Sequence, residues 1–326
     1  MLVDALGLAA IGQGSQMTGV VAPRTEVRFR SGNGECDGWI FRPAASDDRA
    51  LLPIVVLAHG LAGFKSLRLD TYAERFAQRG YLALAFDYRH FGASTGEPRE
   101  LVDLARQLED WRSAVAFART IDGADPEKVI LWGTSFSGGH VMVTAADDDR
   151  VAAVIAQCPF SDGLAAARSM PRRTALRLMR VAVKDQVAAM LGRPPVRMAI
   201  VGAPGEVAVM TSPDSLVGFR AIYDAVGLPF EIPRIPARFM FQVPGYRPGR
   251  RAVDVKSPLL TSLCERDEVT PAKKTEELAR RAPRGEIKRY DVGHFDIYFG
   301  DMFEAVVADQ IEFIERHVPI GTSAGR

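Results

Sequence analysis

Short apolar runs alternate with longer segments of helical periodicity along most of the chain. The runs are rich in β-branched and aromatic residues, which favours strands buried on both faces. They predict strands near 25–30, 37–42, 53–59, 81–87, 128–133, 151–157, 258–264 and 286–292. Helical spacing predicts helices near 66–79, 99–120, 137–146, 271–282 and 301–317. The order predicts an α/β fold: a mostly parallel eight-stranded sheet with helices on both faces, and an antiparallel edge made by the first two strands.

The alternation stops between the sixth and seventh predicted strands. A basic amphipathic helix is predicted from Ala165 to Leu191, and the chain after it is punctuated by proline and glycine. We interpret this insertion as a cap over the end of the sheet. The predicted division is an N-terminal arm (1–24), a core (25–162 and 253–320), a cap inserted after strand six (163–252) and a C-terminal tail (321–326).

Charge is distributed unevenly between the cap and the rest of the chain. Residues 163–252 contain 14 lysines and arginines and 5 acidic residues, which gives +9, whereas the whole chain is +1 and the remainder therefore −8. The basic cap fits a solvated face, and it fits equally a lid that attracts an anionic substrate such as a coenzyme A thioester or a free carboxylate. The small net charge gives no reason to expect a nucleic-acid partner.

Cysteine usage and the N-terminus bear on the compartment. Of Cys36, Cys158 and Cys264, the last two end apolar strands, so we interpret them as reduced core residues, which favours the cytoplasm. The apolar first ten residues contain Asp4 and lack a basic start, unlike a signal peptide. No apolar run approaches the ~20 residues that span a bilayer, and we expect no membrane partner. The oligomeric state stays open, a homodimer included.

Ser135 lies where an apolar run, Val129–Trp132, enters a turn of small residues. A helix-compatible run, Val141–Ala146, follows the turn. This order is typical of a nucleophile elbow, in which a tight turn exposes the serine hydroxyl and aims the first helix amides at it. The G-x-S-x-G pattern is met except at its last position, where Ser137 replaces glycine.

The complete G-x-S-x-G pattern occurs elsewhere, around Ser94. A strand precedes this serine, but Glu97-Pro98 follows it, and proline disfavours helical angles in the residue before it. We therefore interpret Ser94 as a polar loop residue and Ser135 as the nucleophile.

The donors for an oxyanion are expected on the backbone. His59, Gly60 and Leu61 follow the third predicted strand, and Gly60 allows a sharp turn there. We assign the oxyanion hole to the N–H groups of Leu61 and Phe136. His59 is then a structural residue that hydrogen-bonds the loop backbone.

The acid and the base should follow the last two strands. Asp267 comes after the strand that ends at Cys264 and just before a helix that Pro271 can open, with Glu265 and Glu268 as alternatives.

His294 follows the last strand, after a glycine and before the final helix. His90, His140 and His317 fit the role of base less well by position. The chain order serine, aspartate, histidine completes a predicted triad of Ser135, Asp267 and His294.

With these motifs in place, the chain resembles the α/β-hydrolase superfamily from about residue 25 to 317. The stretches HGLAGFKSLRLDTYAERFAQRGYLALAFDYRHFGASTGEPRE and LWGTSFSGGHV resemble a bacterial group similar to fungal polyketide transferases and thiohydrolases. The resemblance implies acyl transfer from a small-molecule ester or thioester, without a metal or other cofactor. It leaves open a hydrolase, an acyltransferase of secondary metabolism that uses the same triad, and a non-catalytic ligand-binding relative.

Overall fold

The structure is a computed structural model that describes residues 24–44 and 51–321. The predicted N-terminal arm, except Arg24, and the predicted C-terminal tail beyond residue 321 lie outside the described residues. None of the described helices is both long and apolar enough to cross a membrane.

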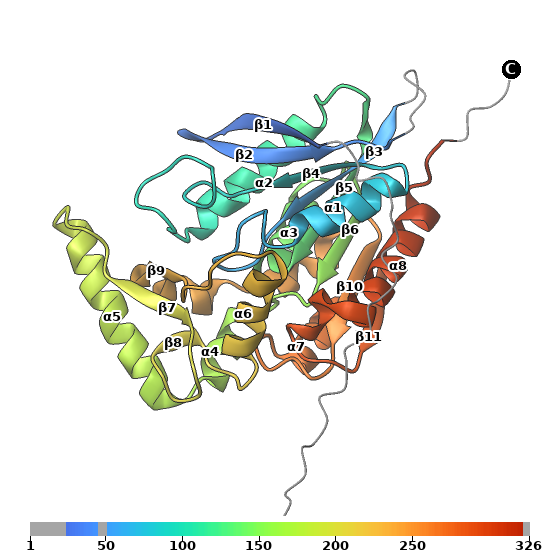
Figure 1. Ribbon diagram of the computed structural model, residues 1–326. Coiled ribbons are helices and arrows are strands. Elements are labelled where there is room, and N and C mark those ends of the chain that lie inside the picture. Colours follow the sequence, from blue (N-terminus) through green and yellow to red (C-terminus); the bar gives the residue numbers. More distant parts are fainter. Residues whose placement is uncertain (1–23, 45–50, 322–326) are drawn as a thin grey trace, which may run out of the picture.

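Within the described residues, eight strands form one sheet in the order β1-β2-β4-β3-β5-β6-β10-β11 (Figure 1). β2 pairs antiparallel with both β1 and β4, and the other neighbours pair in parallel. The predicted sheet and its antiparallel edge are confirmed. The strands are β1 (Arg24–Ser31), β2 (Gly34–Phe41), β3 (Leu52–Ala58), β4 (Leu82–Phe86), β5 (Ala124–Thr134), β6 (Val151–Gln157), β10 (Leu259–Cys264) and β11 (Gly285–Tyr290).

Helices cover both faces of this sheet, as predicted. Val55 and Leu57 of β3 pack in a cluster with residues of α1 and α8, whereas Ile54 and Val56 pack in a second cluster with residues of α2 and α3. Because alternate side chains enter different cores, the strand is an uninterrupted apolar run. The helices are α1 (Leu69–Gln78), α2 (Leu104–Ala118), α3 (Phe136–Asp147), α7 (Ala272–Ala279) and α8 (Gly300–His317).

The predicted start of the second helix, at residue 99, is wrong. α2 begins at Leu104, because the side chain of Asp103 accepts a hydrogen bond from the Arg106 backbone N–H at 3.1 Å and caps the helix.

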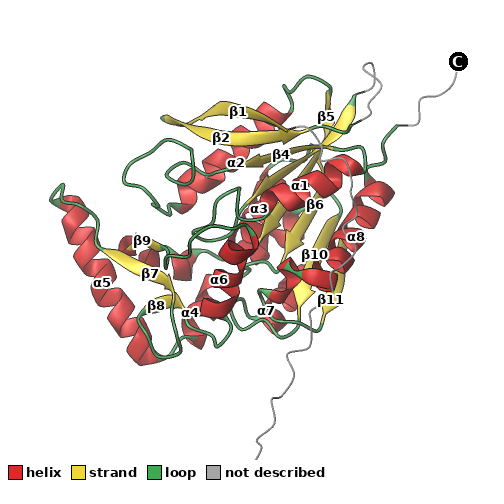
Figure 2. Cartoon of the chain, in the orientation of Figure 1, coloured by secondary structure: helices red, strands yellow, loops and turns green. Residues whose placement is uncertain are grey.

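Residues 163–252 form a layer of helices and a small sheet beside the main sheet (Figure 2). The helix predicted from 165 to 191 is two helices, because Pro171 lacks an N–H and holds Met170 at ψ 135°, outside the helical region. The small sheet, in the order β8-β7-β9, was not predicted, since its strands have only three to five residues. The elements are α4 (Gly163–Ser169), α5 (Arg172–Met190), β7 (Arg197–Val201), β8 (Ala208–Met210), α6 (Ser215–Ala225) and β9 (Arg234–Pro236), followed by 3-10 turns at Ala237–Phe241, Val243–Gly245 and Pro248–Asp254.

Candidate active site

Ser135 occupies the turn between β5 and α3 with φ 54° and ψ −116°. A positive φ is costly for a residue other than glycine, and such strain gathers at functional sites. The glycines on either side of Ser135 allow the backbone of neighbouring segments to pack closely. A Cβ on Gly133 would lie 2.3 Å from the Ser137 carbonyl oxygen, and one on Gly139 would lie 2.4 Å from the Phe160 carbonyl oxygen. The local sequence therefore forces the strand and helix together beneath the serine.

Ser137, the departure from the usual glycine, has a structural use of its own. Its hydroxyl is fully buried and lies 2.8 Å from the Tyr88 hydroxyl, which also accepts a hydrogen bond from the Trp111 indole N–H at 2.8 Å. The serine thus ties the elbow helix to the chain after β4 and to α2.

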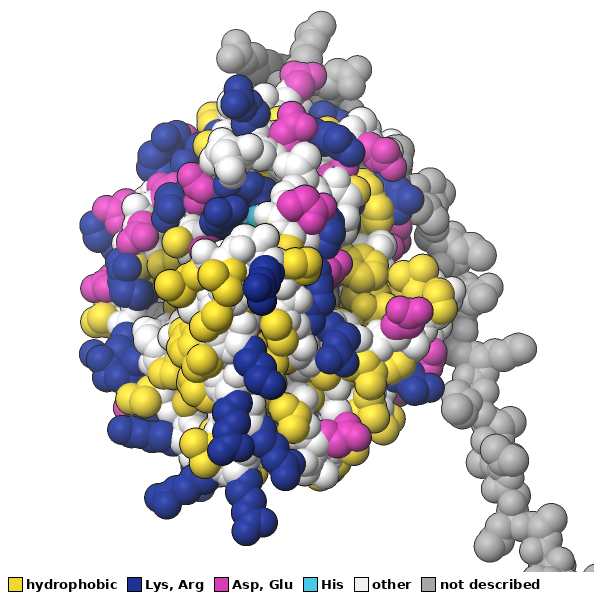
Figure 3. All heavy atoms as spheres, turned by 90° about the vertical axis from the view of Figure 1, so that its left-hand side faces the viewer, with side chains coloured by type: hydrophobic (Ala, Val, Ile, Leu, Met, Phe, Trp, Pro, Cys, Tyr) yellow, Lys and Arg dark blue, Asp and Glu magenta, His cyan; other side chains and the backbone are white. Residues whose placement is uncertain are grey.

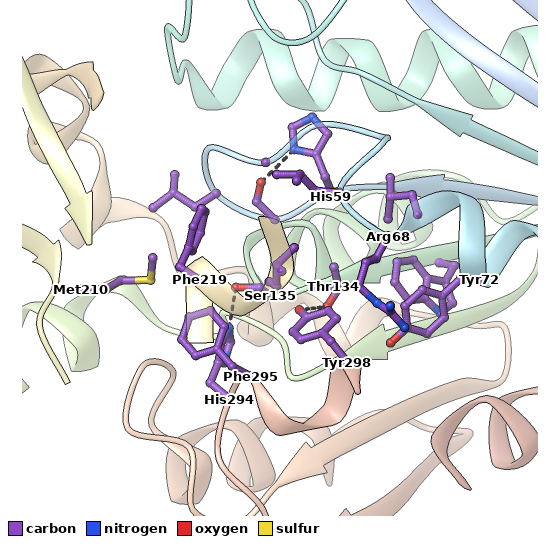
Figure 4. A pocket seen from close by; sticks show the side chains of 17 residues that line it. His59, Arg68, Tyr72, Thr134, Ser135, Met210, Phe219, His294, Phe295 and Tyr298 are labelled. Atoms are coloured by element: carbon purple, nitrogen blue, oxygen red, sulfur yellow. Dashed lines mark hydrogen bonds between the residues drawn. The ribbon is translucent and has the colours of Figure 1, made fainter. Parts of the chain in front are cut away.

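The side chains of Ser135, His294 and Asp267 come together at the carboxyl end of the sheet. Figure 4 shows Ser135 and His294 pointing toward each other. The Ser135 hydroxyl lies 3.1 Å from His294 Nε2, and His294 Nδ1 lies 2.6 Å from Asp267 Oδ2. Both distances are within hydrogen-bonding range. The arrangement lets a base accept the serine proton while a carboxylate orients that base.

Asp267 is held in place by its own loop. Its Oδ1 accepts the backbone N–H groups of Val269 at 2.8 Å and Thr270 at 2.7 Å, and its Oδ2 accepts the Thr270 hydroxyl at 2.8 Å. These donors fix the position and orientation of the carboxylate. The alternatives Glu265 and Glu268 are exposed, and the structure gives neither a hydrogen bond to His294.

Two opposing effects act on His294, which is only 2% exposed. Burial lowers the pKa of His294, whereas the Asp267 carboxylate, with smaller contributions from Cys158 and Asp214, raises it, and the balance raises the pKa to about 9. The imidazolium formed when the serine proton is transferred is therefore stabilised where it forms.

Leu61 and Phe136, whose N–H groups we expect to form the oxyanion hole, line the larger cavity together with Ser135. Neither donates a hydrogen bond to another residue of the part of the chain that the structure describes. A Cβ on Gly60 would lie 3.0 Å from Ser135 Cβ, which is tighter than most contacts of real Cβ atoms, so glycine favours the close approach of this loop to the serine. Free N–H groups at a helix start and in the loop after β3 are suited to an oxyanion.

A buried ion cluster supports the loop that carries Leu61. Lys65 Nζ bridges the carboxylates of Asp37 and Asp87, at 2.8 Å from Asp87 Oδ2, and the Lys65 side chain is 5% exposed. His59, in the same loop, is neutral because burial lowers its pKa, and its Nδ1 donates to the Gly60 carbonyl oxygen at 2.9 Å. His59 thus bonds the loop backbone, as we expected.

Ser94 lies apart from this site. Its buried hydroxyl donates to the Asp87 carbonyl oxygen at 2.7 Å and accepts the Asp37 N–H at 2.8 Å, so it joins the loop after β4 to strand β2. His140 is also buried, which lowers its pKa to about 3, and its Nε2 lies 3.0 Å from the Gln107 side-chain oxygen.

A small and a larger cavity meet at Ser135. The small cavity has a volume of about 60 Å³ and is lined by the loop around Leu61, by His294 and by Arg68 (Figure 4). The larger cavity, about 370 Å³, extends under the insertion. Among the lining residues described, Glu268 is the charged one, and most of the others are apolar. The apolar wall includes Leu61, Phe136, Phe160, Met170, Ala175, Met179, Met210, Phe239, Met240 and Val243.

Two supports of the site were not found from the sequence. Thr270 has a signal in its place three residues after Asp267, because an aspartate in a turn commonly accepts hydrogen bonds from the residues just after it. Lys65 has none, because a lysine in a loop is ordinarily solvated; only the structure shows the two carboxylates around it.

Comparisons with known proteins give matches over most of the chain. A model described as "Alpha/beta hydrolase family" matches residues 55–309. The chain is 43% identical over 308 residues to the quorum-quenching protein AidA of Acinetobacter baumannii, covering 94% of this chain and 99% of that protein. It is 28% identical to polyketide transferase af380 of Aspergillus fumigatus, covering 90% and 99%. The crystal structure of alpha/beta hydrolase GrgF from Penicillium sp. superposes with a TM-score of 0.77 at 24% identity, covering 90% and 99%.

Proposed function

The chain belongs to the alpha/beta hydrolase family, and on that premise we propose that it is a serine-dependent acyl hydrolase of carboxylic esters or thioesters. The observation that supports this most directly is the aligned contact from Ser135 through His294 to Asp267, with the serine at the junction of the cavities.

In the proposed mechanism the Ser135 hydroxyl attacks the acyl carbonyl carbon while His294 Nε2 takes its proton. The carbonyl oxygen becomes an oxyanion, held by the N–H groups of Leu61 and Phe136, each worth ~3–4 kcal/mol in the transition state. The intermediate collapses to an acyl-serine, and His294 returns the proton to the leaving alcohol or thiol. Water, deprotonated by His294, then attacks the acyl-serine and releases the acid.

The larger cavity supports an apolar acyl group as the substrate. If each carbon occupies roughly the ~30 Å³ that water takes in the liquid, 370 Å³ holds about 12 carbons. The methionines in its wall are flexible and suit chains of differing shape. The expectation of an anionic substrate receives no support from this wall, where Glu268 is the charged residue among those described. We infer that the acyl group is uncharged.

The main alternative within the family is transfer of the acyl group to an alcohol. This alternative is supported by the 28% identity of the chain to a protein named polyketide transferase. The two reactions share the acyl-enzyme and differ in the acceptor, so product analysis distinguishes them.

The proposal is tested with p-nitrophenyl esters of rising chain length beside acyl-coenzyme A thioesters, with products analysed in the presence and absence of alcohol acceptors. We expect free acid as the product and rates that rise with acyl length until the cavity is filled. Failure of a fluorophosphonate probe to label Ser135 would instead favour a non-catalytic ligand-binding relative.

A further inference from the structure

The outer face of α5 exposes an apolar stripe that the fold leaves uncovered. Leu176, Val183, Val187 and Met190 are 62%, 49%, 49% and 77% exposed, and Met179 is 37% exposed. These positions recur every three or four residues, so they lie along one side of the helix. Single exposed apolar residues are common, but a continuous stripe marks an interaction surface.

A row of cations runs beside this stripe. Arg173, Arg177, Arg180 and Lys184 are exposed and also recur every three or four residues. None of the four forms an ion pair with another residue in 24–44 or 51–321. In Figure 3 the lower part of this face shows apolar and cationic side chains together, while most acidic ones lie higher.

The inner face explains why the helix is fixed with this side outward. Leu178 and Ala182 are fully buried. Asp185, the single acidic residue of α5, is also buried, where it accepts the Val196 N–H at 2.8 Å and pairs with Arg238 at 2.8 Å. The exposed surface of α5 therefore presents cations and apolar groups without a carboxylate.

We propose that the outer face of α5 is a docking surface for a lipid bilayer with anionic headgroups. A helix with an apolar stripe and Lys/Arg on its polar face is the kind that lies in a membrane interface. Cations close to an anionic bilayer are attracted to its surface, so a row of them adds to the affinity. This inference goes beyond acyl hydrolysis, does not depend on it, and reverses the sequence-based expectation of no membrane partner.

A second copy of the chain fits this face less well. Two copies related by a twofold axis through α5 would set the same unpaired cations against each other. The stripe is also small: 19 residues give ~28 Å of helix, and at ~10 Å width this is roughly 300 Å². A stable dimer needs about 800 Å² from each partner.

Met179 belongs to both surfaces. It is part of the exposed stripe, and together with Ala175 it lines the larger cavity beside Ser135. Docking through α5 would therefore bring the bilayer against one wall of the cavity inferred to take the acyl group.

The proposal is tested by flotation of the full chain with two kinds of vesicle, phosphatidylcholine alone and phosphatidylcholine mixed with phosphatidylglycerol. We expect binding to the mixed vesicles only, weakened by salt because screening shortens the reach of charge. The R173Q/R177Q/R180Q/K184Q variant should lose at least about tenfold in partitioning. V183S/V187S/M190S should lose binding as well.

Matched controls use exposed residues elsewhere. R30Q/K273Q/R281Q/R284Q removes four exposed cations and L51S/V217S/V253S removes three exposed apolar side chains, and both should bind like the parent. Thermal melts check that each variant is folded. Absence of binding by the folded parent protein, or equal losses in the controls, overturns the proposal. So does sedimentation showing a dimer that V183S/V187S/M190S converts to a monomer, since the face would then join two copies.

Discussion

Replacing Asp267 by asparagine tests the electrostatics of the site most directly, because one oxygen of this carboxylate meets His294 Nδ1 at 2.6 Å. The substitution preserves size but removes the charge that raises the pKa of His294 against the lowering effect of burial. It also offers an amide N–H where Nδ1–H needs an acceptor, which favours the wrong imidazole tautomer. We expect kcat to fall by up to ~10⁴-fold.

The raised pKa of His294 also predicts how kcat/KM changes with pH. With a pKa of about 9, His294 is neutral in ~1% of free enzyme near pH ~7 and in about half near pH ~9. Since only the neutral form accepts the serine proton, kcat/KM of the parent enzyme should rise ~50-fold between these pH values. In Asp267→Asn the residual activity should lose this alkaline rise, because burial then lowers the pKa of His294.

The assay is hydrolysis of a neutral p-nitrophenyl ester across this range at constant ionic strength, with Glu265→Gln as the matched control. Glu265 is an exposed carboxylate two residues away, and its loss should change neither kcat nor the profile. A parent profile that is flat above neutral pH would refute the reasoning about His294. Near-normal activity of Asp267→Asn, with a large loss in Glu265→Gln or Glu268→Gln, would move the role of the acid to that neighbour.

Four further predictions follow from the same contacts. Ser135→Ala should abolish esterase activity and fluorophosphonate labelling, whereas Ser94→Ala should keep both; the reverse result would reassign the nucleophile. Lys65→Met strands two buried carboxylates and should cost ~3–5 kcal/mol in urea denaturation, and a loss below ~1 kcal/mol would show that the cluster does not matter to stability. The raised pKa of His294 stabilises the fold fully below its ordinary value of 6.5, and this contribution is lost as pH rises through about 9, so unfolding free energy should fall as activity rises. An unchanged free energy over that range would contradict it. Salt should change kcat/KM alike for neutral and carboxylate-bearing esters, because the residues described in the larger cavity wall include no cation that would attract the carboxylate. A fall in kcat/KM with salt for the anionic ester alone would support the electrostatic lid.

The core could be predicted from the sequence because its signals are local and strong. Apolar strands such as Leu52–Ala58 are buried on both faces, so the run itself marks them. Asp267 and His294 could be placed because each follows a strand whose carboxyl end lies at the same edge of the sheet. Their contacts match the predicted geometry.

What could not be predicted depends on long-range contacts or on very short elements. Strands of three residues such as Ala208–Met210 carry almost no periodicity. The role of Lys65 depends on Asp37 and Asp87, which are 28 and 22 residues away along the chain. Which side of α5 faces solvent likewise depends on the residues that pack beneath the helix. The sequence pattern does not reveal this side, because apolar residues lie on both the buried and the exposed side of α5.

The positions of the cations in residues 163–252 change how the positive charge of this segment is interpreted. From composition, +9 in residues 163–252 fitted equally a solvated face and a lid that attracts an anionic substrate. In the structure the cations of α5 point outward, and the larger cavity beside Ser135 is mostly apolar. Charge and catalysis are therefore physically separated in this insertion. Removing the α5 cations should leave kcat for a water-soluble ester unchanged even where it abolishes vesicle binding, because screening and distance weaken any effect of surface charge on the buried His294. If kcat for the water-soluble ester fell together with vesicle binding, the outer face of α5 and the catalytic site would be coupled.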